Sequence, residues 1–387
     1  MRILHVNETL GFAGGAEQYL FDVAEALFQA GHENGLIFQK RDNRDPVRFV
    51  TPFIDTFDTN SETRQGTGHF IKRFNPDVMY IHRWESLGIL DLPPSGLPLV
   101  RFFHDQDILC LRSSKIFYWT GQICYRPIGL RCIGCLPVSK KAWREGVLTW
   151  PTAVSRQKAN LFSQTSTVQV VVGSQFMKEQ FVKNRISEQQ ITVLPLFTNF
   201  PPRYYPSPNS NTILCVGRID RGKGLDLLLQ SLRFVETTFR LVVAGDGKDL
   251  VCMKRLAKRL NLTEHVQFIG GVKDREKLSD LYQQSKLVAI PSRWAEPFGL
   301  VGIEAMAHGR PVVAFKAGGL RDQILDGETG YLVDEQDVEE FGRKLDHLLC
   351  NPDLCVKMGK AGVEHIECYY SKEKHLAELL HILQEAI

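Results

Sequence analysis

Two series of alternating strands and helices, separated by a proline-rich stretch, constrain the fold of this chain of 387 residues more than any other feature. Short apolar runs predict the strands of the first series at residues 2–7, 35–39, 77–82, 98–103 and 168–172. Residues 195–211 then contain five prolines and cannot form a regular element. The series restarts after them, with strands predicted at residues 212–216, 240–244, 266–269, 287–291 and 311–314.

Helices are predicted between these strands and at the end of the chain. They are expected at about residues 16–30, 225–234, 248–260, 274–284, 299–308 and 372–387. Because alternating strands and helices form parallel sheets with helices on both faces, the sequence predicts an α/β protein with two Rossmann-like domains.

The proline-rich stretch sets the predicted domain boundaries. We expect an N-terminal domain at residues 1–195, with an insertion at 105–150, and a C-terminal domain at 212–365. Residues 196–211 are the predicted linker, and residues 366–387 form a helix that packs back towards the N-terminal domain.

Composition excludes several other classes of protein. The formal net charge of +3 gives no indication of a nucleic-acid partner. The first apolar run becomes polar too early for a signal peptide, and no run approaches the roughly 20 residues that span a bilayer. We therefore expect a cytoplasmic protein. An odd number of cysteines, nine, argues against a disulfide framework in such a chain.

The first candidate site is the loop at residues 217–224, which follows the first strand of the second series. Gly217 and Gly224 permit a close backbone approach, and Arg218 and Lys223 supply two cations. Such a loop suits a diphosphate, although an ordinary exposed basic turn has the same composition. The loop lacks the spacing of a Walker motif, and neither half of the chain contains a dinucleotide fingerprint.

The second candidate site is the segment at residues 296–304, which follows the strand at 287–291. A helix beginning at about Phe298 directs free N–H groups at an anion. Glu304 lies within that helix, where a buried carboxylate needs a partner or a ligand. Glu296 precedes the helix, and by itself it could simply complement the helix dipole. About 12 Å separates two helical residues eight positions apart, so the two glutamates should contact different parts of one ligand.

These motifs resemble those of the retaining GT-B glycosyltransferases of family 4. The resemblance covers nearly the whole chain and also rests on four further segments, namely Gly14-Gly15-Ala16-Glu17, His104-Asp105, Gly245-Asp246-Gly247 and Gly318-Gly319-Leu320. Asp322 stands where the family often has glutamate. The resemblance implies the GT-B fold, in which the parallel sheets of two Rossmann-like domains face a central cleft.

The resemblance also implies roles for individual residues. Arg218 and Lys223 would hold the donor diphosphate and stabilise the leaving group without a metal ion. Glu304 would bind the ribose hydroxyls, and Glu296 and His104 would lie beside the transferred sugar. The remaining predicted contacts to the donor come mainly from backbone groups of Gly14, Gly15, Gly217, Gly245, Phe298, Gly299 and Leu300.

From these residues we expect a metal-independent hexosyltransferase with no cofactor for catalysis. The donor is a nucleotide-diphosphate sugar, and the acceptor is a glycan or lipid-linked glycan, as in polysaccharide biosynthesis. Two alternatives stay open. The chain could be a GT-B epimerase acting on the nucleotide sugar itself, or a non-catalytic nucleotide-sugar-binding protein.

Four cysteines cluster within the insertion, at Cys110, Cys124, Cys132 and Cys135. Four thiolates would complete a structural zinc site, and free thiols are the alternative. Between residues 101 and 158 the chain also has ten Lys/Arg against three Asp/Glu. Together with Phe117, Tyr118, Trp119 and Trp143, this basic excess suggests peripheral docking of a lipid-linked acceptor at the inner face of the membrane. The simpler interpretation is a solvated basic face over a small aromatic core.

Three other histidines are expected to have structural roles. His5 and His308 are predicted core or capping positions. His82, at the end of a strand, is predicted to be structural or to line the cleft.

Overall fold

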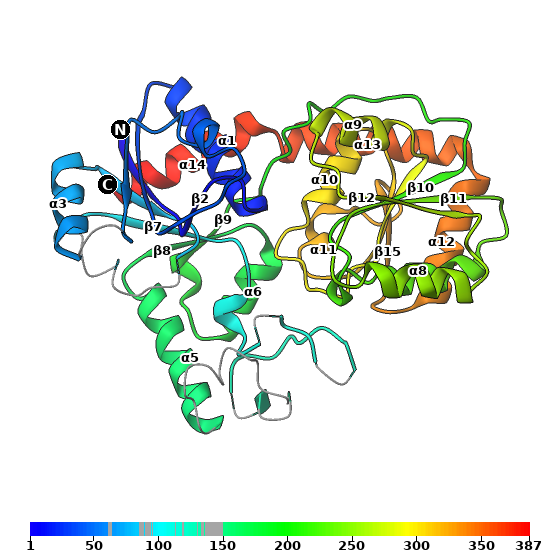
Figure 1. Ribbon diagram of the computed structural model, residues 1–387, viewed down its shortest axis with the longest axis horizontal. Helices are drawn as coiled ribbons and strands as arrows, with labels where there is room; N and C mark the ends of the chain where they lie inside the picture. Colours follow the sequence, from blue (N-terminus) through cyan, green and yellow to red (C-terminus); the bar gives the residue numbers. More distant parts are fainter. Residues whose placement is uncertain are drawn as a thin grey trace. The chain divides into compact units, whose positions relative to one another are not determined.

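The computed structural model describes residues 1–60, 64–84, 89, 94, 96–112, 114–117, 120–129, 131–132, 135 and 150–387. The chain divides into two compact units (Figure 1). The first unit contains residues 1–113, 126–194 and 373–387, and the second contains residues 114–125 and 195–372. Residues 114–125 lie within the N-terminal domain predicted from the sequence, but they belong to the second unit.

The first unit is built on a parallel sheet of seven strands. Their order is β5-β3-β1-β6-β7-β8-β9. The strands are β1 (Arg2–Val6), β3 (Glu33–Phe38), β5 (Asp55–Asp58), β6 (Val78–Ile81), β7 (Leu99–Phe103), β8 (Gln169–Val172) and β9 (Ile191–Val193). The order reverses between β1 and β6, and this switch point is where ligands bind in doubly wound sheets. A small pair of strands, β2 (Thr9–Leu10) and β4 (Lys40–Arg41), lies apart from this sheet.

Alternation of side chains along β3 shows how this sheet is covered on both faces. Leu36 and Phe38 belong to the core cluster that contains Leu20 of α1, whereas Ile37 belongs to the cluster that contains Phe70 of α3. The helices of the unit are α1 (Gly15–Gln29), α2 (Pro46–Phe49), α3 (Arg64–Phe74), α5 (Trp150–Thr165), α6 (Gln175–Lys183) and α14 (Lys372–Ala386).

The last helix returns to the first unit, although it follows the second unit in sequence. In Figure 1, α14 lies beside α1, and the hydroxyl of Tyr19 is 2.9 Å from Nε2 of His375. Both side chains are buried, so this contact anchors α14 through a polar group inside the core.

The second unit has a parallel sheet of six strands in the order β12-β11-β10-β13-β14-β15. The strands are β10 (Thr212–Val216), β11 (Arg240–Ala244), β12 (Val266–Gly270), β13 (Leu287–Ile290), β14 (Val312–Phe315) and β15 (Gly330–Val333). This is the strand order of the Rossmann fold, with the switch point between β10 and β13. The predicted α/β fold with two Rossmann-like sheets is therefore confirmed.

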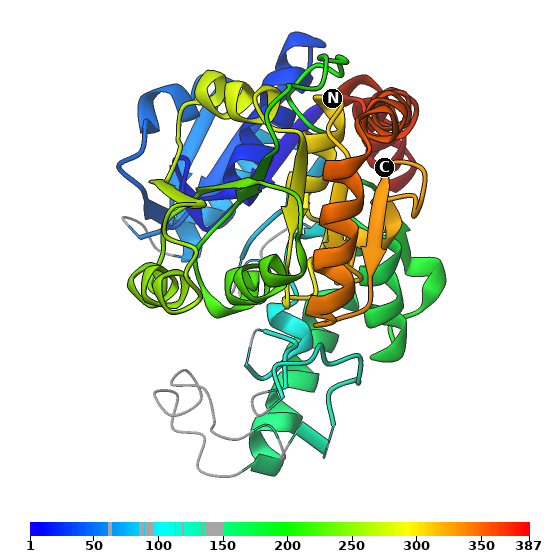
Figure 2. The same cartoon turned by 90° about the vertical axis from the view of Figure 1, so that its right-hand side faces the viewer.

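Helices cover both faces of the second sheet. They are α7 (Leu225–Ser231), α8 (Leu250–Arg259), α9 (Arg275–Gln283), α10 (Leu300–Ala307), α11 (Leu320–Gln323), α12 (Val338–Cys350) and α13 (Pro352–Tyr369). Helix α12 packs on α7 and on strand β14, while α10 packs on α11 and α13. Figures 1 and 2 show α12 running along its face of the sheet.

Two element boundaries differ from the prediction for local reasons. Helix α10 begins at Leu300 and not at Phe298, because Gly299 takes a left-handed conformation with φ of 104° at the N-cap. Strand β14 begins at Val312, one residue after the predicted start, because Pro311 has no N–H for the sheet.

Candidate functional site

The loop after β10 is organised by one carboxylate. Asp220 Oδ1 accepts hydrogen bonds from the backbone N–H groups of Gly222, at 2.9 Å, and Lys223, at 3.3 Å. These bonds hold residues 221–223 in a single 3-10 turn at the carboxyl end of the strand. The turn thereby fixes the backbone from which the Lys223 side chain projects.

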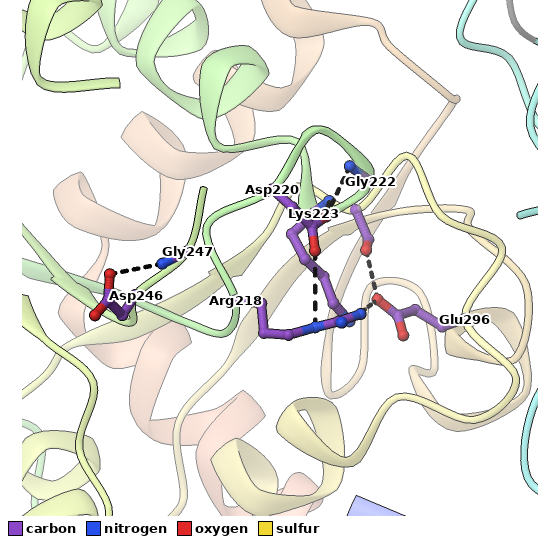
Figure 3. Close-up of polar contacts among 8 residues, drawn as sticks. Arg218, Asp220, Gly222, Lys223, Asp246, Gly247 and Glu296 are labelled. Carbon is purple, nitrogen blue, oxygen red and sulfur yellow. Dashed lines mark hydrogen bonds and ion pairs between the residues drawn. The ribbon is translucent and has the colours of Figure 1, made fainter. Parts of the chain in front are cut away.

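Lys223 forms an ion pair with Glu296. Its Nζ lies 2.7 Å from Oε1 of Glu296, and the Ser292 hydroxyl donates to the same oxygen (Figure 3). The side chain of Glu296 is 9% exposed and that of Lys223 is 30% exposed. The carboxylate is therefore largely removed from water and is stabilised by two donors, while the ammonium group keeps some access to solvent.

Arg218 lies on the same loop, with a much more exposed side chain. Its Nε is 3.7 Å from Oδ2 of Asp220, and 77% of the side chain is accessible. Such an exposed pair contributes little to stability. The guanidinium group can therefore turn towards an anion at small cost.

Glycine at position 224 allows the loop to pack on the end of β13. Gly224 has φ of 68°, and a Cβ atom there would lie 1.9 Å from the carbonyl oxygen of Pro291. No side chain fits in that space. The contact brings the Lys223 turn against the segment that leads to Glu296.

Gly245 makes the corresponding approach between the first two strand ends of the unit. A Cβ atom on Gly245 would lie 1.8 Å from the carbonyl oxygen of Gly217. The loops after β10 and β11 are therefore in backbone contact. On the next residue, Asp246 Oδ1 accepts a hydrogen bond of 2.7 Å from the N–H of Gly247 (Figure 3).

The segment after Glu296 leads into α10. Gly299 is the N-cap of this eight-residue helix, and Leu300 is its first residue, so free N–H groups lie at this end. The Phe298 side chain is buried and its carbonyl oxygen accepts a 2.7 Å hydrogen bond from Gln323. The Glu296 carbonyl oxygen accepts one from Gly319 N, also at 2.7 Å. These bonds fix the loop from both sides.

Glu304 lies inside α10, and a hydroxyl group holds it. Tyr282 donates to Oε2 of Glu304 at 2.8 Å. Burial raises the pKa of Glu304 above its ordinary value, and the Tyr282 hydrogen bond and Arg275 oppose that shift. The carboxylate is thus oriented by a fully buried tyrosine.

The remaining predicted residues lie in the first unit. His104 follows β7 directly, and Gly14 is the exposed N-cap of α1, which begins at Gly15. Burial, with a smaller effect from the nearby charge of Arg83, lowers the pKa of His104 to about 3. His104 is therefore neutral at pH 7.

The four cysteines of the predicted zinc site are all described. Cys110, Cys124, Cys132 and Cys135 are each partly exposed. Across the described part of the chain, no three His, Cys, Asp or Glu side chains form a group that could hold a metal ion. The structure thus gives the zinc hypothesis no support.

The aromatic residues of the insertion are only partly described. Tyr118, Trp119 and Trp143 lie outside the described residues, whereas Lys115 is almost fully buried and adds nothing to a basic surface. Within the described ranges, no helix combines the length and apolarity needed to cross a membrane.

Two polar residues at the site were not identified from the sequence. Ser292 and Tyr282 are the hydroxyl donors to Glu296 and Glu304. A serine after a strand and a tyrosine inside a helix are too common to indicate a site. Their role follows only from their position beside the two glutamates.

This arrangement can bind an anion next to a polar group. Lys223 and Arg218 supply positive charge, the start of α10 supplies N–H groups, and Glu296 supplies an acceptor for hydroxyl groups. All of them lie at the carboxyl ends of β10 and β13, beside the switch point of the sheet.

Two family models match the chain and together span residues 13–365. "Glycosyltransferase Family 4" matches residues 13–199, and "Glycosyl transferases group 1" matches residues 198–365.

Curated relatives align with less than half of the chain. D-inositol 3-phosphate glycosyltransferase of Corynebacterium urealyticum is 35% identical over 176 residues, which are 42% of this chain and 41% of that protein. An uncharacterized glycosyltransferase of Haemophilus influenzae is 32% identical over 185 residues, 47% of this chain and 50% of that one. The alignments thus span half or less of these relatives.

Solved structures resemble the chain over its full length. Anabaena HepE in complex with UDP has a TM-score of 0.76 and 18% identity, with 100% of both chains covered. A glycosyltransferase of Rickettsia africae has a TM-score of 0.74 and 20% identity, covering 100% of this chain and 98% of that one. These similarities establish the GT-B fold.

Proposed function

The chain belongs to the group 1 glycosyltransferases of family 4, and from this premise we propose that it is a retaining, metal-independent hexosyltransferase. It transfers a hexose from a nucleotide-diphosphate sugar to a hydroxyl group of a glycan or lipid-linked glycan. The observation that carries the proposal is the ion pair between Lys223 and Glu296 at the carboxyl ends of β10 and β13. It joins a cation for the diphosphate to an acceptor for sugar hydroxyls.

The proposed chemistry follows the charge that develops as the sugar–phosphate bond breaks. Negative charge grows on the departing diphosphate, and Lys223, Arg218 and the N–H groups at the start of α10 stabilise it. Glu304 binds the ribose hydroxyls and thereby orients the donor. Glu296 and His104 hold the transferred sugar, whose anomeric carbon becomes electron-poor.

We propose the UDP-sugars as the first donors to test. UDP is the ligand of Anabaena HepE in a structure with the same fold. The acceptor panel includes D-inositol 3-phosphate, because curated relatives are named for that acceptor. Glycans and lipid-linked glycans complete the panel.

The test is thermal stabilisation of the purified protein by nucleotide diphosphates and their sugars. A bound nucleotide raises the melting temperature by mass action. We expect one nucleotide to raise the melting temperature, and we expect both Lys223→Ala and Glu304→Ala to abolish this increase. Lys277→Ala is the control. The side chain of that lysine is 76% exposed, and its ion pair with Asp274, at 3.9 Å, is a weak surface pair. A well-folded protein that no nucleotide stabilises contradicts the proposal.

Product analysis separates the proposed transferase from its alternatives. A transferase gives glycosylated acceptor and nucleotide diphosphate, with the anomeric configuration of the donor kept. An epimerase gives an isomerised sugar nucleotide without any acceptor. A non-catalytic protein binds the nucleotide and leaves it unchanged. Activity in the presence of EDTA tests metal independence.

Two further proposals concern the insertion and the compartment. We propose a cytoplasmic protein that contacts the inner face of the membrane through the exposed Arg126 and Arg131. Vesicle flotation tests this, since Arg126→Gln with Arg131→Gln should release the protein from anionic vesicles. Metal analysis of the pure protein decides between zinc and free thiols for the four cysteines.

A further inference from the structure

Three histidines in the first unit form a continuous chain across the sheet. His5 lies in β1, His82 directly follows β6 and His104 directly follows β7, and these three strands are neighbours. The ring nitrogens of successive histidines are 3.3 Å apart, from His5 Nδ1 to His82 Nε2 and from His82 Nδ1 to His104 Nε2. The rings are also nearly parallel, with interplanar angles of 12° and 18°.

The histidine chain begins with a hydrogen bond to Asn34 on the adjacent strand β3. Its Nδ2 donates to the carbonyl oxygens of Ala24, at 2.8 Å, and Pro52, at 3.2 Å. Because a carbonyl oxygen can only accept, these two bonds fix the orientation of the amide. Oδ1 of Asn34 therefore faces Nε2 of His5, at 3.2 Å, and Nε2 of His5 must carry the hydrogen.

The same reasoning passes from one ring to the next, because a neutral imidazole has one donor and one acceptor nitrogen. Burial lowers the pKa of His5 to about 4, and it also lowers the pKa values of His82 and His104, so all three are neutral at pH 7. With its hydrogen on Nε2, His5 accepts at Nδ1, so His82 donates from Nε2.

His82 in turn accepts at Nδ1, so His104 donates from Nε2. The Nδ1 atom of His104 is left with its lone pair. Among the residues that the structure describes, none donates a hydrogen bond to this atom, and His104 is only partly buried. The last acceptor of the chain is therefore available to a ligand.

Aromatic rings enclose the chain and keep water from its middle. Tyr80 and Phe102 pack against His82 and His104 with centroid distances of 4.3 and 4.5 Å. Asn34 and His5 are fully buried, and His82 is 2% exposed. Without water to supply alternative partners, each ring keeps the tautomer that its neighbour requires.

We propose that Asn34, His5 and His82 are positioning residues for His104. They hold it as the neutral Nε2–H tautomer, so that its Nδ1 accepts a hydrogen bond from a hydroxyl group of the bound substrate. The assignment of a substrate hydroxyl rests on the proposed function, in which His104 lies beside the transferred sugar. The tautomer itself does not depend on that function.

The direct test is ¹⁵N NMR of histidine side chains in the full chain, which distinguishes the two neutral tautomers. The eleven histidines are assigned by single substitutions. We expect His5, His82 and His104 each to carry the proton on Nε2 at pH 7. In His82→Phe, which keeps a ring but removes both hydrogen bonds, His104 should become a mixture of tautomers. A proton on Nδ1 of His104, or an unchanged tautomer in His82→Phe, overturns the proposal.

Substitutions of Asn34, at the start of the histidine chain, give an independent test. Asn34→Leu removes the acceptor for His5, whereas Asn34→Asp keeps it. We expect the tautomer of His104 to become mixed with leucine and to stay Nε2–H with aspartate. Equal spectra for the two variants contradict the proposal. If Asn34→Leu does not fold, the comparison of wild type with His82→Phe still decides.

Activity provides the second readout. We expect His82→Phe to lower kcat by up to about tenfold, the equivalent of one hydrogen bond, while nucleotide affinity stays unchanged. Tyr80→Phe is the matched control. It removes a buried hydroxyl that forms a 3.0 Å hydrogen bond with the hydroxyl of Tyr19, which is not part of the histidine chain. Equal loss of kcat in both variants contradicts a positioning role. If wild type lacks transferase activity, the proposed function fails and the NMR result still tests the tautomer.

Discussion

Nζ of Lys223 lies 2.7 Å from Oε1 of Glu296, so two residues 73 positions apart form an ion pair within the second unit. The pair has two consequences for a diphosphate ligand. It holds the lysine in place before the ligand arrives, and it also neutralises part of the positive charge that the ligand needs. Binding and transfer should therefore respond differently when the carboxylate is changed.

We predict that Glu296→Gln separates these two effects. Glutamine keeps the size of the side chain but removes the negative charge, so Lys223 can interact fully with a diphosphate. Nucleotide diphosphate affinity should be retained or increase, while kcat for sugar transfer should fall about 10- to 100-fold, because sugar hydroxyls lose a charged acceptor. Calorimetry and initial rates measure the two quantities.

Glu339→Gln is the control for that experiment. Glu339 is 50% exposed and pairs with Arg343 one helical turn away, which contributes little. A parallel loss of affinity and kcat in Glu296→Gln would contradict the proposed division of roles.

Gly224→Ala should displace the Lys223 loop without unfolding the unit. A Cβ atom at this position would lie 1.9 Å from the Pro291 carbonyl oxygen, so the loop must move away from β13. We predict that nucleotide-dependent thermal stabilisation is lost. Gly270→Ala is a close control, because Gly270 also has positive φ, 80°, yet no neighbouring atom lies within 4 Å of its added Cβ. If both variants bind nucleotide like wild type, the close approach is not required.

The strands that the sequence predicted best are those with continuous apolar runs. Thr212–Val216 and Arg240–Ala244 match the predicted ranges, since a buried parallel strand needs such a run. Strand β5 (Asp55–Asp58) was missed because it has two aspartates among its four residues and lies at the edge of the sheet. An edge strand can leave such side chains in water, so it lacks the apolar signal.

The candidate site was predictable as residue types but not as pairs. Glycine, arginine, lysine and glutamate on two loops indicated an anion site, whereas the contact between Lys223 and Glu296 depends on which strands are neighbours. The same holds for His5, whose sequence context predicts a core or capping position. It is buried, as expected, but its bond to His82 becomes visible only once β1 and β6 are paired.

Tyr282→Phe should weaken nucleotide binding and shift its pH dependence. The hydrogen bond from Tyr282 lowers the pKa of Glu304 against the effect of burial, so its loss raises that pKa further. More of Glu304 is then protonated at a given pH, and a protonated carboxyl accepts ribose hydroxyls less well. We predict about a three- to tenfold loss of affinity at pH 7, with the acid limb of binding moved to higher pH.

Titration calorimetry across a pH series measures this shift. Tyr331→Phe is the control, because Tyr331 lies on the edge strand β15 and its ring contacts His347 instead. An acid limb at the same pH in wild type and Tyr282→Phe would show that the hydroxyl does not tune Glu304.

Acid should destabilise the first unit through its buried histidines. Folding lowers the pKa of His5 from 6.5 to about 4 and that of His104 to about 3, and it also lowers that of His82. Below pH 6.5 the unfolded chain therefore binds protons that the folded chain does not. The contribution of these neutral histidines to stability is therefore fully present above pH 6.5. It decreases as the pH falls towards 4, by at most about 1.4 kcal/mol per pH unit for each histidine.

Calorimetric melting of wild type and His82→Phe between pH 7.5 and 4.5 measures this contribution. The variant lacks one of the three histidines, so its melting temperature at acid pH should fall less steeply. The carboxylates that titrate in the same range are common to both proteins and cancel in the comparison. If the melting temperatures of the two proteins fell equally with pH, His82 would be protonated equally in the folded and unfolded chain. Burial in an aromatic layer would then not keep the histidine chain neutral.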